Sequence, residues 1–232
     1  MTDLYLLKIP EEKQRAELFE KHKINLLPIN VKEKILLTRD ENTKRERMYA
    51  YGLLCETLIQ SGISNKTLID GFFFDEKGKP KINQSKLHCS VSRTDGIAAV
   101  AINKERPIGV DVEKIDVSKK EKIASLVSRF GFDSEKTDIC ENPKIILFTE
   151  KDGKIVKKSG LQFEKKSDEN INFLRWTALE SILKCDGRGF EAIKMISDIS
   201  NDVHTESFLF SVDGHMYALS LSENKQTEKY SL

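Results

Sequence analysis

The feature that most constrains this chain is a short segment in which acidic and β-branched residues alternate, PIGVDVEKID from Pro107 to Asp116. Successive side chains of an extended strand point to opposite faces. Asp111 and Glu113 therefore share one face of the predicted strand, while Val110 and Val112 share the other, in apolar surroundings. Two carboxylates on one face form half of a site for a hard cation such as Mg²⁺, which prefers oxygen ligands.

A second segment, the predicted helix RWTALESILK from Arg175 to Lys184, supplies a third carboxylate. Glu180 and Lys184 are four residues apart, so they lie on the same face of this helix. The spacing places a candidate metal ligand beside a fixed positive charge. Such a pair suits a substrate that carries phosphate, because Mg²⁺ commonly completes its shell with carboxylates, waters and substrate phosphates.

Each of these signals also has an ordinary structural explanation. An acidic strand can simply face water at a sheet edge, and a Glu and a Lys four apart form a surface ion pair worth only ~0.3–0.5 kcal/mol. Trp176 lies at helical spacing from Leu179 and Leu183, as a core residue would. The argument for a site comes from the combination of segments, in this order and with this spacing.

The composition bounds the class of protein. The 232 residues can bury a core as one large domain or two small ones. The 38 basic and 37 acidic residues give a net charge of +1, so no overall field favours nucleic-acid binding. No segment approaches the ~18 apolar residues of a membrane span, and the N-terminal segment lacks the pattern of a signal peptide. We therefore expect a soluble, cytoplasmic protein that binds neither nucleic acid nor membrane.

The cysteines and histidines are scattered, without the C-x-x-C spacing of a zinc site. His88 and Cys89 are adjacent, and neighbours on a strand point in opposite directions, which disfavours a shared zinc ion. The thiols are therefore expected to be reduced and buried. The four cysteines are Cys55, Cys89, Cys140 and Cys185.

Two parts of the chain share a pattern in which an arginine-bearing helix precedes a hairpin. In the first, a helix predicted over 43–60 carries Arg47, and an Asp-Gly pair at 95–96 separates two extended runs. In the second, the helix that begins at Arg175 precedes an Asp-Gly pair at 213–214. The repetition indicates a duplicated helix-plus-hairpin unit.

This pattern predicts an α+β fold of two pseudo-symmetric halves, residues 1–107 and 108–232. Each half is expected to hold a long helix packed on a small antiparallel sheet. The acidic strand and the second helix would then lie where the halves meet, which is where ligand clefts tend to form. The active site is therefore expected at this junction.

Local signals predict further elements. Ser118 is a candidate N-cap for an amphipathic helix that follows Asp116, and a strand pair is expected over Lys154–Phe163. The remaining predictions are a strand at Leu4–Ile9, helices at Glu11–His22 and Lys32–Leu37, and a hairpin at Gly71–Ile82. The charged region 132–172 gives few other signals.

Taken together, these segments resemble the 4'-phosphopantetheinyl transferase superfamily, in its Sfp-type branch of two fused pseudo-symmetric halves. The family pairs G-[IV]-D-[IV]-E with a later W-x-x-K-E-x-x-x-K. Here the first motif is intact at Gly109–Glu113, and the second runs from Trp176 to Lys184. The supporting matches are the turn Gly78-Lys79-Pro80, the helix that bears Arg47, and Ser92 ahead of a hairpin. The similarity covers most of the chain and thins over 132–172.

The resemblance implies an enzyme that moves the phosphopantetheine arm of coenzyme A onto a serine of an apo acyl or peptidyl carrier protein. Adenosine 3',5'-bisphosphate is the product released, and the enzyme is expected to be a monomer. The implied ion is Mg²⁺, with Mn²⁺ as the alternative, held at the pyrophosphate by Asp111, Glu113 and Glu180. The implied catalytic residues are Glu180, which removes the serine proton itself or through a water on the metal, and Lys184, which contacts a phosphate oxygen.

The same resemblance implies a nucleotide-binding set. Its members are Arg47, Gly78, Lys79, Pro80, Ser92 and Arg93, together with Lys184. The chain departs from the family at two points. Leu179 replaces the lysine before the motif glutamate, and Ser92-Arg93-Thr94 replaces the S-H-S of many relatives. Arginine still binds phosphate, whereas Leu179 removes one positive charge from the helix.

Two hypotheses follow, an active transferase and a catalytically silent relative that binds coenzyme A or a carrier protein as a regulatory module. Leu179 is the residue that favours the second. A basic helix just after the acidic strand offers a surface for an acidic carrier, although it also has the character of a solvated face. Its cations are Lys119, Lys120, Lys122 and Arg129.

Overall fold

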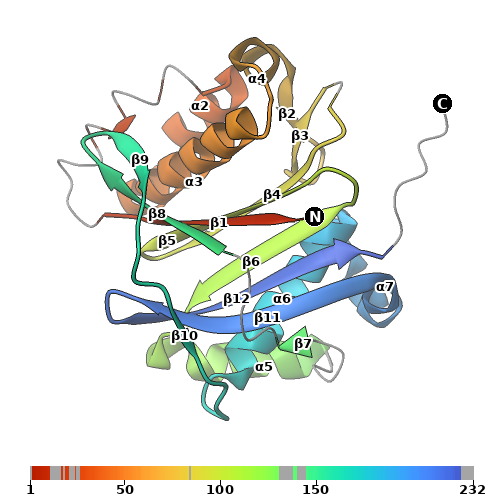
Figure 1. Cartoon of the computed structure of the whole chain (residues 1–232). Helices are drawn as coiled ribbons and strands as arrows, with labels where there is room; N and C mark the ends of the chain where they lie inside the picture. Colours follow the sequence, from red (N-terminus) through yellow and green to blue (C-terminus); the bar gives the residue numbers. More distant parts are fainter. Residues whose placement is uncertain are drawn as a thin grey trace.

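The computed structural model describes residues 2–10, 17, 19–20, 24, 27–83, 85–130, 138–139 and 145–225, and Figure 1 shows their arrangement. Within these ranges the fold is α+β, as expected, with two larger sheets and a small two-stranded one. The helices of the described part of the chain lack the length and apolar character needed to cross a membrane. The predicted helix at Glu11–His22 lies largely outside the described residues, as does Cys140.

The first large sheet has the strand order β4-β5-β1-β8-β9. Its strands are β1 (Asp3–Lys8), β4 (His88–Thr94), β5 (Ile97–Asn103), β8 (Ile145–Lys151) and β9 (Lys154–Lys157). β1 pairs antiparallel with β5 and parallel with β8. The hairpin at Gly71–Ile82 is confirmed as a separate small sheet of β2 (Phe72–Phe74) and β3 (Pro80–Ile82).

The second large sheet has the order β10-β11-β12-β6, with β7 paired to β11. Its strands are β6 (Ile108–Lys114), β7 (Asp138–Ile139), β10 (Gln162–Glu164), β11 (Val203–Val212) and β12 (His215–Asn224). Both Asp-Gly pairs form the predicted hairpin turns, between β4 and β5 and between β11 and β12. The acidic segment is a strand that pairs antiparallel with β12.

The two larger sheets lie between the helices of the first sheet and those of the second (Figure 1). Because side chains alternate along a strand, each strand contributes to two layers of the core. Leu7 on β1 joins the cluster between the first sheet and its helices, while Leu6 joins the cluster between the two sheets. On β6, Val110 and Val112 face this inter-sheet cluster, as the alternation predicts. Asp111 and Glu113 therefore point to the opposite side, toward the helices of the second sheet.

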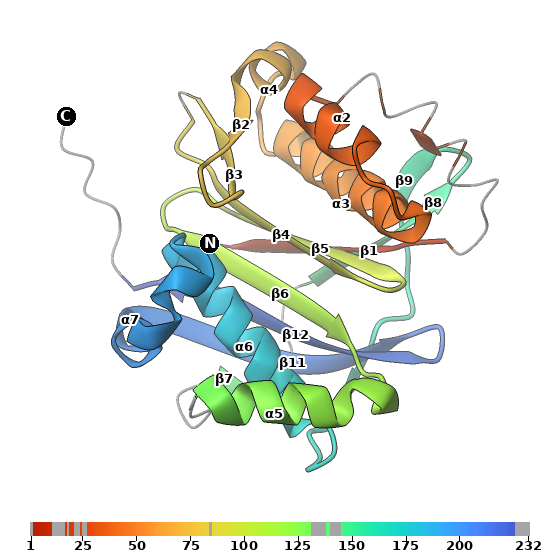
Figure 2. The same cartoon turned by 180° about the vertical axis from the view of Figure 1, so that it is seen from behind.

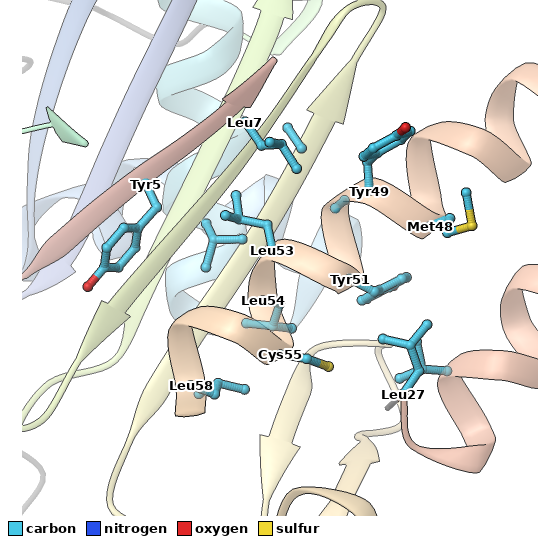
Figure 3. Packing of buried hydrophobic residues seen from close by; sticks show 14 of the residues in the cluster. Tyr5, Leu7, Leu27, Met48, Tyr49, Tyr51, Leu53, Leu54, Cys55 and Leu58 are labelled. Carbon is cyan, nitrogen blue, oxygen red and sulfur yellow. The ribbon is translucent and has the colours of Figure 1, made fainter. Parts of the chain in front are cut away.

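The helices of the first sheet are α2 (Ile29–Leu36), α3 (Glu41–Gln60) and α4 (Asn65–Gly71). The Asp40 carboxylate accepts the Thr43 backbone N–H and begins α3 with a regular N-cap. Figure 3 shows how side chains of α3 such as Leu53 and Leu54 point onto the strands of the first sheet. This buried face fixes the helix and so fixes the direction of Arg47, near its beginning.

The helices of the second sheet are α5 (Lys120–Phe130), α6 (Ile171–Asp186) and α7 (Ile196–Asp202), and a 3₁₀ helix, Gly189–Met195, lies between α6 and α7. α6 lies directly on β6. A Cβ atom at Gly109 would stand 1.9 Å from the carbonyl oxygen of Ser181 and 2.5 Å from the backbone nitrogen of Cys185. Only glycine allows the helix backbone to approach the strand this closely. Gly187, at φ 86°, ends α6 in a left-handed glycine cap.

Side-chain hydroxyls join the edge strands of the two sheets. Ser90, Ser92 and Thr94 on β4 accept the backbone N–H groups of Val110, Val112 and Lys114 on β6, at 3.0, 3.3 and 3.3 Å. Figure 2 shows β6 between β4 and β12. The hydroxyls of β4 replace the backbone carbonyls of a neighbouring strand. These three amide groups of β6 are therefore paired, although β6 is an edge strand.

Two local predictions need correction. Asp116, rather than Ser118, caps the turn after β6, because its carboxylate accepts the backbone N–H of Ser118 and begins a 3₁₀ helix, Val117–Lys119, that leads into α5. The strands expected at Lys154–Phe163 exist as β9 and β10, but they pair with β8 and β11 in different sheets. The apolar run from Ile145 to Phe148 supplies the β9 partner.

We expect Gly109→Ala to lower the free energy of unfolding by at least about 3 kcal/mol, because the added methyl group meets helix backbone that cannot rotate away. Urea denaturation measures the loss. Gly71→Ala is the matched control, since a Cβ there meets its nearest atom at 3.5 Å, an ordinary contact. Similar losses in both variants would contradict the role of the close contact.

Candidate functional site

A pocket of about 320 Å³, which we call the central pocket, opens where α2, α3, β4, β6 and α6 meet. Every residue expected to hold the metal ion or to catalyse the reaction lines it, as do three expected nucleotide ligands from α3 and β4. The lining residues are Lys34, Arg47, Ala50, Tyr51, Val91, Ser92, Arg93, Asp111, Val112, Glu113, Trp176, Glu180 and Lys184. Residues distant in sequence therefore meet in one cavity.

Asp111 lies at the centre of the polar contacts in this pocket. Its Oδ1 accepts hydrogen bonds from the Lys184 ammonium at 2.6 Å and from the Ser92 hydroxyl at 2.8 Å. Lys184 Nζ also lies 3.2 Å from Ser92 Oγ and 3.9 Å from Glu180 Oε2. Asp111 is almost fully buried, and a buried carboxylate is stable only when it is paired and hydrogen-bonded. Ser92 and Lys184 meet that requirement.

Glu180 has an environment that disfavours its charge. The pKa of this carboxyl is raised from its ordinary value of 4.5 to about 8, first by burial and then by the negative charges of Asp111 and Glu113, against a lowering by Lys184. The three carboxyls are therefore close enough to repel one another. A cation among them would remove that repulsion.

Glu113 has a lysine partner of its own. Its Oε1 accepts a hydrogen bond from Lys119 Nζ at 2.8 Å. Within the described ranges, no three or more His, Cys, Asp or Glu side chains surround a single metal position. Each strand carboxylate is instead neutralised by a lysine, Asp111 by Lys184 and Glu113 by Lys119.

The donor chemistry nevertheless fits a hard divalent cation. All three groups are carboxylates, which Mg²⁺ and Mn²⁺ accept. After burial, the charges of Asp111 and Glu113 contribute to the raised pKa of Glu180, and an ion would relieve that repulsion. Asp111, Glu113 and Glu180 are the residues that would hold such an ion. Lys184 and Lys119 would have to leave Asp111 and Glu113 for the ion to bind.

Besides Lys184, three cations line the central pocket, and we call them the cationic wall. Arg47 donates to the Thr38 hydroxyl at 2.6 Å, and Arg93 Nε lies 3.9 Å from Glu46 Oε2. Burial lowers the pKa of the Lys34 ammonium, and the positive charges of Arg47 and Arg93 lower it further. Like charges held this close form a site for an anion with several oxygens, such as a phosphate.

The turn residues Gly78, Lys79 and Pro80 lie outside the central pocket and line a neighbouring one of about 200 Å³. The two pockets share Tyr51, Val91 and Lys184 in their linings. Lys79 Nζ donates to the carbonyl oxygens of Lys184 and Cys185, at 2.6 and 3.1 Å, in the last turn of α6. The ammonium therefore caps this helix end, where a positive charge is stabilising, and burial lowers its pKa.

Leu179 belongs to the core and does not line either pocket. It is fully buried in a cluster with Ile196 and Ile199 of α7. The side chain that departs from the motif therefore packs between helices. Its neighbour Trp176 does line the central pocket, where its ring stacks on Phe190 with centroids 6.3 Å apart.

No known family model matches the chain, and a comparison with curated proteins gives no significant match. The case for a function therefore depends on the motifs and on the geometry of the two pockets.

Two polar residues of this lining, Lys34 and Tyr51, were not predicted from the sequence. Lys34 reaches the pocket because α2 packs beside α3, and no motif surrounds it. Its Nζ lies 3.9 Å from the Phe74 ring centroid and 5.7 Å from that of Tyr51. Tyr51, whose pKa is raised by burial, follows Arg47 by one helical turn, and that spacing was the signal that could have identified it.

The shifted pKa of Glu180 predicts a pH-dependent stability. Between about pH 4.5 and 8 the unfolded chain releases the proton that the folded protein retains, so Glu180 lowers the free energy of unfolding as pH rises through this window. We expect the free energy of unfolding of Glu180→Gln, relative to that of wild type, to increase by on the order of 1–3 kcal/mol from pH 5 to pH 8. Denaturant titrations at both pH values measure the gain.

Added Mg²⁺ provides the control for this experiment. An ion held by the three carboxylates would favour ionised Glu180 and stabilise wild type more than the variant. A stability difference that stays constant between the two pH values would contradict the burial of an ionisable Glu180.

Proposed function

We propose that this protein transfers the 4'-phosphopantetheine arm of coenzyme A to a serine of an apo carrier protein, with Mg²⁺ or Mn²⁺ as cofactor. The observation that carries the proposal is the central pocket, whose lining combines three carboxylates with the cationic wall. A diphosphate bound to a divalent ion has the complementary charges. The expected ligands of the ion and several expected ligands of the phosphates line this same pocket.

Each wall has a distinct task in this proposal. Arg47, Arg93 and Lys34 bind phosphate oxygens of the nucleotide, including its 3'-phosphate, through charge-assisted hydrogen bonds. The neighbouring pocket with Gly78, Lys79 and Pro80 receives another part of the nucleotide. Lys79 contributes by holding the turn against the end of α6, which is a supporting role rather than a direct grip.

The chemical step is a displacement at phosphorus. The carrier serine oxygen attacks the phosphorus next to the pantetheine, a new P–O bond forms, and the bond to the bridging oxygen of the diphosphate breaks. Adenosine 3',5'-bisphosphate leaves with that electron pair. A bound divalent ion supplies charge neutralisation at the diphosphate.

The protein residues supply the proton transfer and the positioning. Glu180, or a water held by the divalent ion, would take the serine proton as general base. Lys184 donates to a phosphate oxygen from the same helix face. Ser92, already bonded to Asp111, orients that carboxylate rather than the nucleotide.

We also propose that the chain consists of two pseudo-symmetric halves, 1–107 and 108–232, with the site at their junction. Each half contributes a hairpin with an Asp-Gly turn and a long helix, α3 or α6. The strands β8 and β9 depart from this division, because they follow β6 in sequence but join the sheet of β1. Such a transferase would act as a cytoplasmic monomer.

The silent regulatory module is the second hypothesis, and Leu179 was its support. The burial of Leu179 in the helix cluster gives this residue a packing role away from the pocket. The carboxylates, Lys184 and the cationic wall remain together. The active transferase is therefore the better supported of the two.

The direct test is incubation with apo carrier protein, coenzyme A and Mg²⁺, followed by mass spectrometry of the carrier. We expect a mass gain of one phosphopantetheine group for wild type, and a loss of at least about 100-fold in rate for Asp111→Ala and Glu180→Ala. Both variants should stay folded, since their side chains line a pocket. Glu164→Gln is the control, because Glu164 lies on β10 at the opposite edge of the sheet. Coenzyme A binding without any mass gain would favour the silent module.

Carrier docking on α5 gives a separate expectation. Lys120 and Lys122 lie in its exposed first turn, and they would attract an acidic carrier. We expect Lys120→Glu with Lys122→Glu to raise KM for the carrier by about tenfold and to leave KM for coenzyme A within about twofold. Lys119 is excluded from the change because it pairs with Glu113. Equal changes in both constants would argue against this surface.

A further inference from the structure

The starting observation is that one oxygen of Asp111 has two donors. Lys184 Nζ lies 2.6 Å and Ser92 Oγ 2.8 Å from Asp111 Oδ1. The Asp111 side chain is only 5% exposed, against 33% for Lys184. The carboxylate is therefore fixed, while the lysine has open space on the pocket side. Within the Lys184–Asp111 pair, Lys184 is therefore the residue that can move.

A divalent ion on Asp111 would meet the ammonium of Lys184 at close range. Two positive charges within a few Å in a partly buried pocket repel strongly, because water screens them poorly. An ion can therefore bind Asp111 only as Lys184 leaves it. The nearest other carboxylate within reach is Glu180, at 3.9 Å, but Glu180 is itself an expected ligand of the ion.

A phosphate group solves this conflict. Lys184 lines both pockets. A phosphate in the central pocket can therefore accept hydrogen bonds from its ammonium group when the divalent ion binds Asp111. We propose that Lys184 is an internal counter-ion of Asp111 that passes to the phosphate when the divalent ion binds, so that ion and phosphate substrate bind cooperatively. This inference rests on the proposed function, and it adds an order of events that the motif alone does not give.

The pair Lys119–Glu113 differs from the pair Lys184–Asp111 in its exposure to water. Lys119 is 45% exposed and Glu113 20% exposed, so water can replace the contact when it opens. The Lys184–Asp111 contact lies deeper and includes Ser92. Coupling between ion and anion should therefore depend on Lys184 above all.

The test measures Mn²⁺ affinity from the free-ion EPR signal, with and without saturating coenzyme A, after subtraction of the Mn²⁺–coenzyme A complex measured in buffer. For wild type we expect coenzyme A to tighten Mn²⁺ binding by at least about tenfold. Lys184→Met should bind Mn²⁺ alone at least about tenfold tighter than wild type. Coenzyme A should tighten its Mn²⁺ binding by a factor at least about threefold smaller than in wild type, because only direct coordination by the diphosphate remains. Lys184→Gln, which keeps a hydrogen-bond donor without the charge, should behave in the same way.

Lys114→Met is the matched control. It removes one charge from β6 itself, but Lys114 pairs with Asp95 at 2.7 Å and does not contact the carboxylates of the site. The control should leave Mn²⁺ affinity within about twofold of wild type. An equal gain in Lys114→Met would overturn the inference in favour of a general field effect.

Two further outcomes would also overturn it. These are Mn²⁺ binding by wild type that is indifferent to coenzyme A, and Lys184 variants that bind Mn²⁺ alone no tighter than wild type. Thermal unfolding of each variant shows whether the comparison is between folded proteins. The titration without nucleotide needs no transfer activity. A chain that fails to modify any carrier, yet shows the tighter binding in both Lys184 variants, would remove the proposed function and support the counter-ion role.

Discussion

The contact between the backbone of α6 and the surface of β6 at Gly109 is the constraint on which the pocket depends. Because no side chain separates them there, the helix lies close enough for Lys184 to reach Asp111, two residues further along the strand. Glu180, one turn earlier on the helix, lies beside the same carboxylate. A bulkier residue at 109 would move the helix, and with it both of these groups. The glycine of the motif is thus as much a part of the site as its acids.

The edge-to-edge joint between the sheets complements this contact. The hydroxyls of β4 hold the amides of β6, and Ser92 uses the same hydroxyl to donate to Asp111. Arg93, the next residue, contributes to the cationic wall. One strand therefore supports the acidic wall and the basic wall together.

Local patterns predicted the elements of this fold better than their association. Alternation placed Val110 and Val112 in the core, and Asp-Gly pairs located both hairpins. The sequence did not reveal that β8 and β9 return to β1, because parallel pairing between distant segments leaves no local signal. Lys34 was missed for a similar reason, since it reaches the pocket only through helix packing. Lys79 was read as a nucleotide ligand from its motif, whereas its ammonium faces carbonyl groups of α6.

The return of β8 and β9 to the first sheet bears on how the chain can be divided. A fragment ending at residue 107 would contain β1, β4 and β5 but would lack the strand that pairs with the other side of β1. Leu4 and Leu6 would then lie in an open sheet edge, a surface that promotes aggregation. The segments 1–107 and 108–232 therefore share one sheet, because β8 of the second segment pairs with β1 of the first. Co-expression of complementary fragments, rather than isolated production of either one, is the arrangement compatible with this topology.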